Sequence, residues 1–207
     1  MKSIVHILSK DPDLCECKTR LRDFLSNKER VYLSKTMLMM LCSEMNKIDV
    51  YKLLHLYPSN QGKFSKKLSQ RFNINTTRQM SGYLSDKIFS ALDNTDESYQ
   101  KRILVGSDVP SLSKHDIKDS IYYLDTFDVV IGPSNDGGFY LVGTKNNSHS
   151  IFKNLKLNKI SKQDIFNLCS KEKLSFKTLR VLKDIDVPKD LLFLQLTFCE
   201  DHLVLYT

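Results

Sequence analysis

The sequence alternates short apolar runs, rich in β-branched residues, with longer segments in which apolar residues recur every three or four positions. The short runs are typical of buried strands and the longer segments are typical of amphipathic helices. Strands and helices that alternate along a chain favour a mostly parallel sheet covered by helices on both faces. No internal repeat and no linker rich in Gly, Pro or Ser interrupts the pattern, so we predict a single α/β domain over residues 1–207.

The pattern predicts six strands and six helices. The expected strands cover residues 3–8, 50–56, 102–105, 128–132, 139–143 and 178–182. The expected helices cover residues 28–47, 64–72, 82–92, 113–124, 161–174 and 188–198. The first helix is the longest, because apolar residues keep helical spacing through it without a Pro or Gly. The last helix begins at Pro188, and proline suits the first turn of a helix.

Polar side chains follow several of the expected strands. In a parallel sheet, ligands bind beyond the carboxyl ends of the strands, so these residues are candidates for one site. They are Lys18 and Arg20 after the first strand, Asp108 after residues 102–105, Asp136 after residues 128–132, and Asp184 and Asp186 after residues 178–182. A guanidinium beside an ammonium group suits a diphosphate. Carboxylates on fixed strand ends suit Mg²⁺ or Mn²⁺, which take their remaining ligands from phosphates and water.

Taken one at a time, these clusters favour structural interpretations. Asp108 suits the cap of a turn before a proline. Residues 184–190 suit the start of a helix at Pro188, with acidic side chains near the positive end of the helix dipole. Residues 133–138 suit a hairpin turn. However, a turn that only reverses the direction of the chain can be shorter than six residues, and the two glycines leave room for a ligand at the backbone. Asp136 is therefore a candidate base or hydroxyl acceptor.

The amino-acid composition limits the classes of molecule that the chain is expected to bind. The chain has 31 basic and 24 acidic residues and a formal net charge of +7, but the lysines are dispersed and lack interleaved aromatic residues. We therefore predict a phosphate-bearing small molecule as the ligand rather than a nucleic acid. The longest apolar stretch, residues 37–42, is far shorter than the roughly 20 residues that a membrane span needs. With no signal-peptide pattern and five cysteines that lack zinc-binding spacing, we expect a cytoplasmic protein with reduced thiols.

Four motifs, taken in order, are more specific than any one of them. They are Lys10-x-Pro12 with Lys18-Thr19-Arg20-Leu21, then Gly106-Ser107-Asp108-Val109-Pro110, then Gly132-Pro133-x-x-Asp136-Gly137-Gly138-Phe139, and finally Asp184-x-Asp186-x-Pro188-x-Asp190-Leu191. This series resembles a bacterial family of glycosyltransferase-like proteins, also called radical-SAM/selenodomain-associated or arsenosugar-biosynthesis transferases. The resemblance covers nearly the whole chain.

The resemblance implies a Rossmann-like GT-A fold of the nucleotide-diphospho-sugar transferase superfamily, related to the molybdenum-cofactor guanylyltransferases. It also implies roles for individual residues. Those expected to bind the nucleotide-sugar donor are Lys10, Lys18, Arg20, Gln79, Gly137 and Gly138. Asp108 and Asp186 are expected to hold Mg²⁺ or Mn²⁺, and Asp136 is expected to be the catalytic residue that contacts or deprotonates the acceptor.

The sequence departs from the family pattern at three places. Cys15 stands where the first loop usually has Gly, Tyr83 stands where a Gly-Asp-Leu-Gly-Glu-Arg segment has its Asp, and residues 157–159 replace a Trp-Ser-Thr motif. Our leading hypothesis is a metal-dependent glycosyltransferase. A nucleotidyltransferase that releases pyrophosphate is the alternative, although the first loop lacks the glycines of the guanylyltransferases. A third hypothesis is a nucleotide-binding or scaffold protein that keeps the fold without catalysis.

Overall fold

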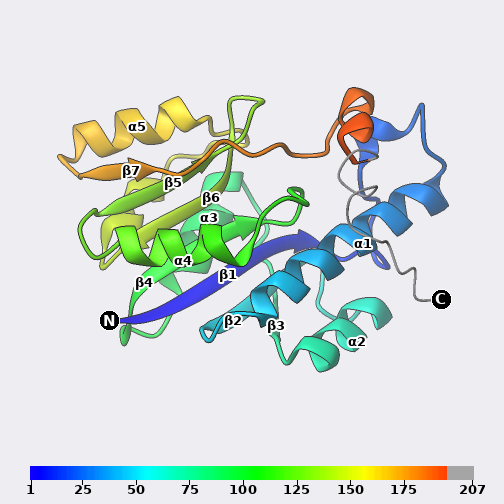
Figure 1. Cartoon of the computed structure of the whole chain (residues 1–207), viewed down its shortest axis with the longest axis horizontal. Coiled ribbons are helices and arrows are strands. Elements are labelled where there is room, and N and C mark those ends of the chain that lie inside the picture. The colour runs from blue at the N-terminus through cyan, green and yellow to red at the C-terminus, as the bar shows by residue number, and fades with distance from the viewer. Residues whose placement is uncertain (195–207) are drawn as a thin grey trace.

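Within residues 1–194, seven strands form one sheet in the order β3-β2-β1-β4-β6-β5-β7 (Figure 1). The structure is a computed structural model and describes residues 1–194. The strands are β1 (Lys2–Lys10), β2 (Tyr51–Tyr57), β3 (Asn75–Arg78), β4 (Tyr99–Gly106), β5 (Val129–Pro133), β6 (Phe139–Lys145) and β7 (Phe176–Thr178). Strand β6 is antiparallel to its neighbours β4 and β5, and the other pairs are parallel. The predicted mostly parallel sheet is therefore confirmed.

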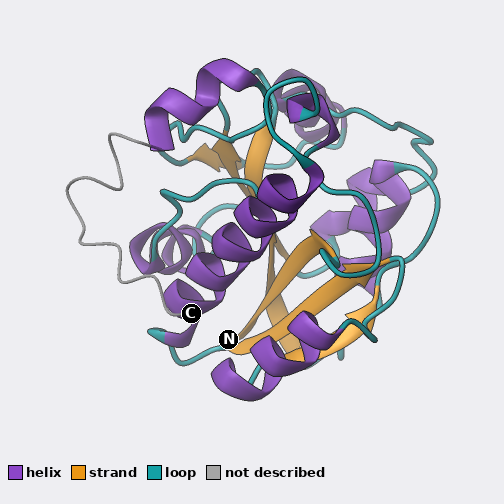
Figure 2. Cartoon of the chain, turned by 90° about the vertical axis from the view of Figure 1, so that its right-hand side faces the viewer, coloured by secondary structure: helices purple, strands orange, loops and turns teal. Residues whose placement is uncertain are grey.

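Helices cover both faces of this sheet, as Figure 2 shows from the side. The α-helices are α1 (Asn27–Asn46), α2 (Lys63–Phe72), α3 (Leu84–Asp93), α4 (Lys114–Tyr123) and α5 (Lys162–Lys171). Short 3₁₀ helices are η1 (Thr19–Leu21), η2 (Ser148–Phe152) and η3 (Pro188–Asp190). One core cluster joins the sheet to α1, α2 and α4, and a second joins the opposite face to α3, α5 and η2. No helix in residues 1–194 is both long and apolar enough to span a membrane.

The structure corrects the sequence prediction at the end of the chain and adds an edge strand. A strand is expected at residues 178–182, but strand β7 lies earlier and ends at Thr178. Farther along the chain, Leu182 forms an isolated β-bridge with Ser134. Stacking of Phe176 on Phe166, with ring centroids 4.9 Å apart, fixes the earlier position of β7. Of the helix expected at 188–198, residues 188–190 form η3 and residues 191–194 are helical, while 195–198 lie outside the described residues.

Strand β3 was absent from the sequence prediction because its residues, Asn-Thr-Thr-Arg, carry no apolar signal. Among the described strands it lies at the edge of the sheet and pairs with β2 alone, from Leu53 opposite Asn75 to Leu56 opposite Arg78. An edge strand can be held by backbone hydrogen bonds without burying its side chains. The strand places the segment that follows it, including Gln79, at the carboxyl edge of the sheet.

Gly132 of β5 sits where the chain has no space for a side chain. A Cβ atom there would lie 2.4 Å from Cζ of Tyr140 and 2.9 Å from Cβ of Leu141, and both of those residues are buried. We expect Gly132→Ala to lower the free energy of unfolding by about 1–3 kcal/mol, measured by urea denaturation, because core overpacking costs about that much. Gly106→Ala is the matched control, since a Cβ at Gly106 would meet nothing within 4 Å. Equal stability of the two variants would contradict this prediction.

Candidate active site

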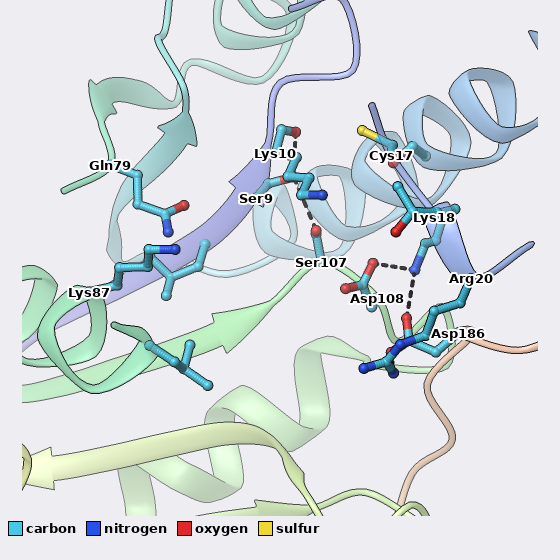
Figure 3. Close-up of a pocket in the computed structure, with 14 residues that line it drawn as sticks. Ser9, Lys10, Cys17, Lys18, Arg20, Gln79, Lys87, Ser107, Asp108 and Asp186 are labelled. Atoms are coloured by element: carbon cyan, nitrogen blue, oxygen red, sulfur yellow. Dashed lines mark hydrogen bonds and ion pairs between the residues drawn. The ribbon is translucent and has the colours of Figure 1, made fainter. Parts of the chain in front are cut away.

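A pocket of about 320 Å³ opens at the carboxyl edge of the sheet (Figure 3). It lies over the ends of β1 and β4, which place Ser9 and Ser107 in its floor. The Ser107 hydroxyl donates a hydrogen bond to Ser9 Oγ over 3.0 Å, so the two strand ends are tied together. Six of the residues predicted from the sequence line this pocket: Lys10, Lys18, Arg20, Gln79, Asp108 and Asp186. The structure therefore brings together residues from both ends of the chain.

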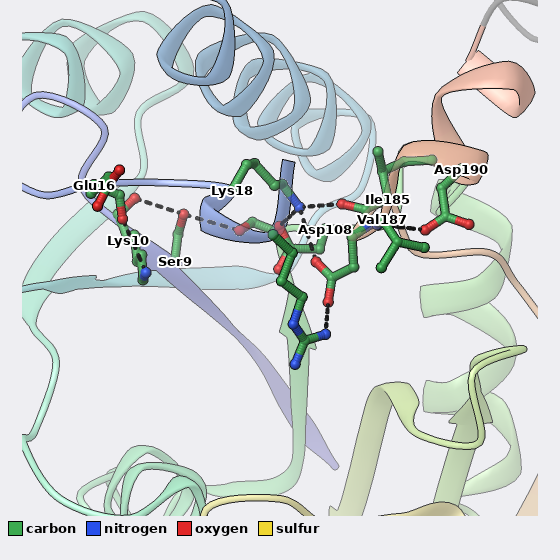
Figure 4. A network of polar contacts seen from close by, with 11 residues as sticks. Ser9, Lys10, Glu16, Lys18, Asp108, Ile185, Val187 and Asp190 are labelled. Carbon is green, nitrogen blue, oxygen red and sulfur yellow. Dashed lines mark hydrogen bonds and ion pairs between the residues drawn. The ribbon is translucent and has the colours of Figure 1, made fainter. Parts of the chain in front are cut away.

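Lys18 occupies the centre of the polar contacts in the pocket (Figure 4). Its backbone has φ 49°, in the left-handed region, and it precedes η1, which is anchored by the fully buried Leu21. The Lys18 side chain is only 4% exposed. Its ammonium group donates to Asp108 Oδ1 and to the carbonyl of Ile185 at 2.7 Å, and it lies 3.6 Å from Asp186 Oδ1. All of these acceptors come from distant segments, so Lys18 joins the first loop to the end of β4 and to the last loop.

Asp108 and Asp186, from the middle and the last part of the sequence, therefore converge on the ammonium group of Lys18. The loop that carries Asp186 is fixed on both sides of it. The backbone N–H of Ile185 donates to the carbonyl of Asp108 at 2.9 Å, and Ile185 is fully buried. The carboxylate of Asp190 accepts from the N–H groups of Asp186 at 3.1 Å and Val187 at 2.8 Å. Asp190 thus lies in the first turn, as the helix-start interpretation predicts, and in addition accepts from the N–H groups at that end.

Arg20 adds a second cation next to the carboxylates. Its Nη1 atom lies 3.0 Å from Asp186 Oδ2, yet the Arg20 side chain is 66% exposed. An ion pair at this exposure contributes little to stability, about 0–1 kcal/mol, so the guanidinium can change partner at little cost. We expected Lys18 and Arg20 to face a diphosphate. In this structure both instead contact carboxylates.

The predicted residues Asp136, Gly137 and Gly138 are not among the described residues that line the pocket. They form the turn between β5 and β6, so the hairpin interpretation of this segment is confirmed. Ser134 Oγ donates to Asp136 at 2.6 Å and Gly138 N–H donates at 2.8 Å. Gly137 has φ 91° and its carbonyl accepts from Lys162 N–H at the start of α5. The glycines therefore shape the turn and hold the Asp136 carboxylate.

The turn nevertheless lies on the same edge as the pocket, and charges link the two. Burial alone would raise the pKa of Asp136, but hydrogen bonds from Ser134 and Gly138 and the charges of Lys159 and Arg20 lower it. The pKa of Asp184 is raised by burial and by the negative charges of Asp136, Asp186 and Asp190. Asp136 is thus held ionised beside Arg20, whereas Asp184 is the more basic carboxylate. Several carboxylates on this side of the edge are thus close enough to influence one another.

Several polar residues that line the pocket were not predicted as site residues, among them Ser9, Lys87 and Ser107. Ser9 and Ser107 sit directly at the ends of β1 and β4, so the rule that ligands bind beyond strand ends would have included them. Lys87 lies one turn into α3, at the position of the Arg in the family's Gly-Asp-Leu-Gly-Glu-Arg segment, which could have included it. Within residues 1–194, no group of three or more His, Cys, Asp or Glu side chains is placed to hold a metal ion.

The fold and the site together define the class of protein. The chain superimposes on a protein from Desulfovibrio desulfuricans G20, provisionally described as a nucleotide-diphospho-sugar transferase, with a TM-score of 0.86 and 21% identity over 98% of this chain and 90% of that one. A 4-diphosphocytidyl-2C-methyl-D-erythritol synthase from Anaerococcus prevotii gives a TM-score of 0.68 and 10% sequence identity, over 96% of both chains. A manganese complex of Rv0371C from Mycobacterium tuberculosis gives a TM-score of 0.57 and 11% identity, over 93% of this chain and 98% of that one. The fold is thus that of the GT-A and nucleotidyltransferase group.

The sequence comparison identifies the family. Residues 44–159 match the model of a family described as an uncharacterized protein conserved in bacteria (DUF2064), and this chain belongs to that family. A 2-phospho-L-lactate guanylyltransferase from Methanocaldococcus vulcanius is 28% identical over 128 residues. That alignment covers 62% of this chain and 55% of the relative, so it spans little more than half the relative's length. The GT-A fold predicted from the sequence motifs is confirmed.

Proposed function

We propose that this protein is a metal-dependent glycosyltransferase that moves a sugar from a nucleoside diphosphate to an acceptor. The observation that carries the proposal is the convergence of Asp108 and Asp186 beside a pocket that Lys10, Lys18 and Arg20 also reach. Two fixed carboxylates next to several cations are what a complex of a divalent ion with a diphosphate requires. The fold and the location at the carboxyl edge of the sheet support the same conclusion.

The side chains present fit a Mg²⁺ or Mn²⁺ ion. Asp108 and Asp186 supply hard oxygen ligands, and the ammonium group of Lys18 already occupies the space between them, so that space suits a positive charge. Two carboxylates are enough when phosphate oxygens and water complete the coordination. When bound, the ion offsets the negative charge that develops on the leaving diphosphate. In that complex we assign Lys18 and Arg20 to the phosphates, because both would be released from their carboxylate partners.

The carboxylates near the β5–β6 turn favour transfer of the sugar to an uncharged acceptor. Asp136, held ionised by Ser134 and Gly138, would accept a hydrogen bond from the acceptor hydroxyl. Asp184, with its raised pKa, lies in the same acidic region and is the stronger base. A phosphate monoester, which a nucleotidyltransferase would use as its second substrate, would be repelled by these carboxylates. We assign Gly137 and Gly138 to the support of Asp136 rather than to the donor.

Nucleotidyl transfer is the second candidate function, and one observation favours it. The curated relative from Methanocaldococcus vulcanius is a guanylyltransferase, and several fold neighbours are nucleotidyltransferases. In that reaction the same carboxylates and cations would bind a nucleoside triphosphate, and pyrophosphate would leave. The two reactions share the donor side of the site and differ in the bond that is broken.

Product analysis separates the two reactions. The protein would be titrated with a panel of nucleotide sugars and nucleoside triphosphates, with and without Mn²⁺, by calorimetry, and the mixtures analysed for free nucleoside diphosphate and for pyrophosphate. We expect Mn²⁺-dependent binding of a nucleotide sugar and slow release of its nucleoside diphosphate. Pyrophosphate release from a triphosphate, without turnover of any nucleotide sugar, would establish the second function. No binding in any titration would favour a scaffold that has lost catalysis.

A further inference from the structure

The pocket has two chemically different sides (Figure 3). The residues of one side, which we call the carboxylate side, pair with one another: they are Lys18, Arg20, Asp108 and Asp186. The other side, next to α3, presents N–H donors and no carboxylate among the described lining residues: Lys10, Gln79 and Lys87. The positive groups on the carboxylate side are thus already neutralised, whereas those on the α3 side are not. An anion entering the pocket is attracted to the α3 side first.

Lys87 is the lining lysine whose ammonium group has no hydrogen-bond acceptor among the described residues. Its ammonium group makes no hydrogen bond or ion pair within residues 1–194, and its contact is with the ring of Tyr57, whose centroid lies 5.6 Å from Nζ. By contrast, Lys10 donates to the carbonyl of Glu16 at 3.0 Å, and Lys18 donates to Asp108 and to the carbonyl of Ile185 and lies 3.6 Å from Asp186. An ammonium group carries three donors, so Lys87 can bind an anion without breaking an existing bond.

The position of Lys87 is set by a well-anchored helix. The N–H of Ser85 donates to the carbonyl of Leu157 at 3.1 Å, and the N–H of Leu157 donates back to Ser85 Oγ at 3.0 Å. Ser85 is fully buried, and Ile88 on the next turn packs in the core. Lys87 therefore projects into the pocket from a rigid element, beside the amide of Gln79. Pre-positioned donors of this kind bind anions with a small entropic cost.

We propose that Lys87 and Gln79 form an anion subsite that binds a phosphate oxygen of the donor, on the side of the pocket opposite Asp108 and Asp186. The inference rests on the proposed function, since it concerns the same donor, and it adds Lys87 to Gln79, which was already predicted to bind the donor. The subsite explains how a polyphosphate is oriented in a pocket that also contains carboxylates. The phosphate chain extends from Lys87 toward the carboxylate side, where the ion holds its other end.

A series of ligands with increasing phosphate number tests this subsite. The dissociation constants of uridine and guanosine, and of their mono-, di- and triphosphates, would be measured by calorimetry with Mn²⁺ for the wild type and for Lys87→Gln. We expect Lys87→Gln to weaken binding of the di- and triphosphates about tenfold, the usual scale of a lost charge-assisted hydrogen bond. Binding of the nucleosides should change less than twofold. Lys87→Arg, which keeps the charge, should bind within about threefold of the wild type.

Lys66→Gln is the matched control, because Lys66 is exposed on α2, outside the pocket, and its replacement removes the same charge. Thermal unfolding without ligand shows whether Lys87→Gln is folded, and Lys87→Met, which retains the aliphatic stem, replaces it if it is not. The subsite is overturned if the Lys87 variant binds all ligands like Lys66→Gln. It is also overturned if Lys87→Gln weakens binding of the nucleoside and binding of the triphosphate by the same factor, since that result indicates a contact with the base. Failure of the wild type to bind any nucleotide would instead refute the proposed function.

Discussion

Asp108→Asn is expected to weaken Mn²⁺-dependent binding of the nucleotide about 100-fold and to lower turnover by at least the same factor. The substitution preserves the size of the side chain but replaces a charged ligand of the proposed metal site with a neutral amide. Stabilisation of a leaving group by a bound metal ion is worth several kcal/mol, and about 1.4 kcal/mol corresponds to a factor of ten. Calorimetry with and without Mn²⁺ measures the binding effect, and a product assay measures turnover.

The fold should tolerate this substitution, so that the effect can be assigned to the site. The Asp108 side chain is 53% exposed, and its partner Lys18 retains the carbonyl of Ile185 and the carboxylate of Asp186. We therefore expect the free energy of unfolding to change by about 1 kcal/mol or less. Asp49→Asn is the control, because Asp49 is exposed just before β2, at the opposite edge of the sheet. Unchanged Mn²⁺ dependence in Asp108→Asn would refute the proposed metal site.

A second large effect is expected from two buried histidines on neighbouring strands. Thr95 Oγ1 donates to the carbonyl of Ala91 at 3.2 Å, so it accepts from Nε2 of His6 at 3.1 Å. Nδ1 of His6 then carries no proton and accepts from Nε2 of His55 at 3.0 Å. Burial, together with the charges of His55 and Arg102, lowers the pKa of His6 to about 3, and burial lowers the pKa of His55 to about 4. Both rings are therefore neutral in the folded protein.

The folded protein is expected to lose stability steeply between about pH 6 and pH 4.5. In this range the unfolded chain protonates both histidines, whose ordinary pKa is 6.5, while the folded chain does not. The unfolded state binds more protons, so the free energy of unfolding decreases as the pH falls. Two protons correspond to a slope of about 2.7 kcal/mol per pH unit near pH 5. Above about pH 7.5, where the unfolded chain has also lost these protons, this contribution is constant. Urea denaturation at a series of pH values measures the slope.

Replacing one member of the pair tests the cause of this slope. His55→Gln retains a side-chain N–H that can donate to His6 and removes one titrating ring, so the slope near pH 5 should fall by about 1.4 kcal/mol per pH unit. His115→Gln is the control, because His115 is exposed on α4 and its removal should leave the slope nearly unchanged. Equal slopes for the wild type and His55→Gln would show that the buried pair does not govern acid stability.

The helices and most strands could be predicted from the sequence because apolar residues recur every three or four positions in the helices and form short runs in the strands. Helix α1 spans 27–46 against a predicted 28–47, and β2 spans 51–57 against 50–56. Prediction failed where side chains carry no such signal. Strand β3 is polar and is held by its neighbour's backbone, and β7 is positioned by the stacking of Phe176 on Phe166. Both depend on contacts with residues distant in sequence.

For the candidate site too, part of the arrangement could be predicted from the sequence and part depends on contacts between distant residues. Strand-end position and motif spacing selected six residues that line the pocket. They did not reveal that Lys18 contacts both Asp108 and Asp186, because that contact spans 90 residues on one side and 168 on the other. They also did not show that Asp136 lies in a hairpin turn outside the lining of the pocket, or that Lys87 enters the pocket from a helix.

By itself, the sequence determined the class of fold, since hydrophobic periodicity fixes which elements form, and the order of those elements limits how a sheet can be assembled. Only the tertiary structure decided which charges become partners. Ion pairs depend on distances of a few ångströms between side chains from separate segments, and those distances exist only after the sheet, its helices and the last loop have packed together.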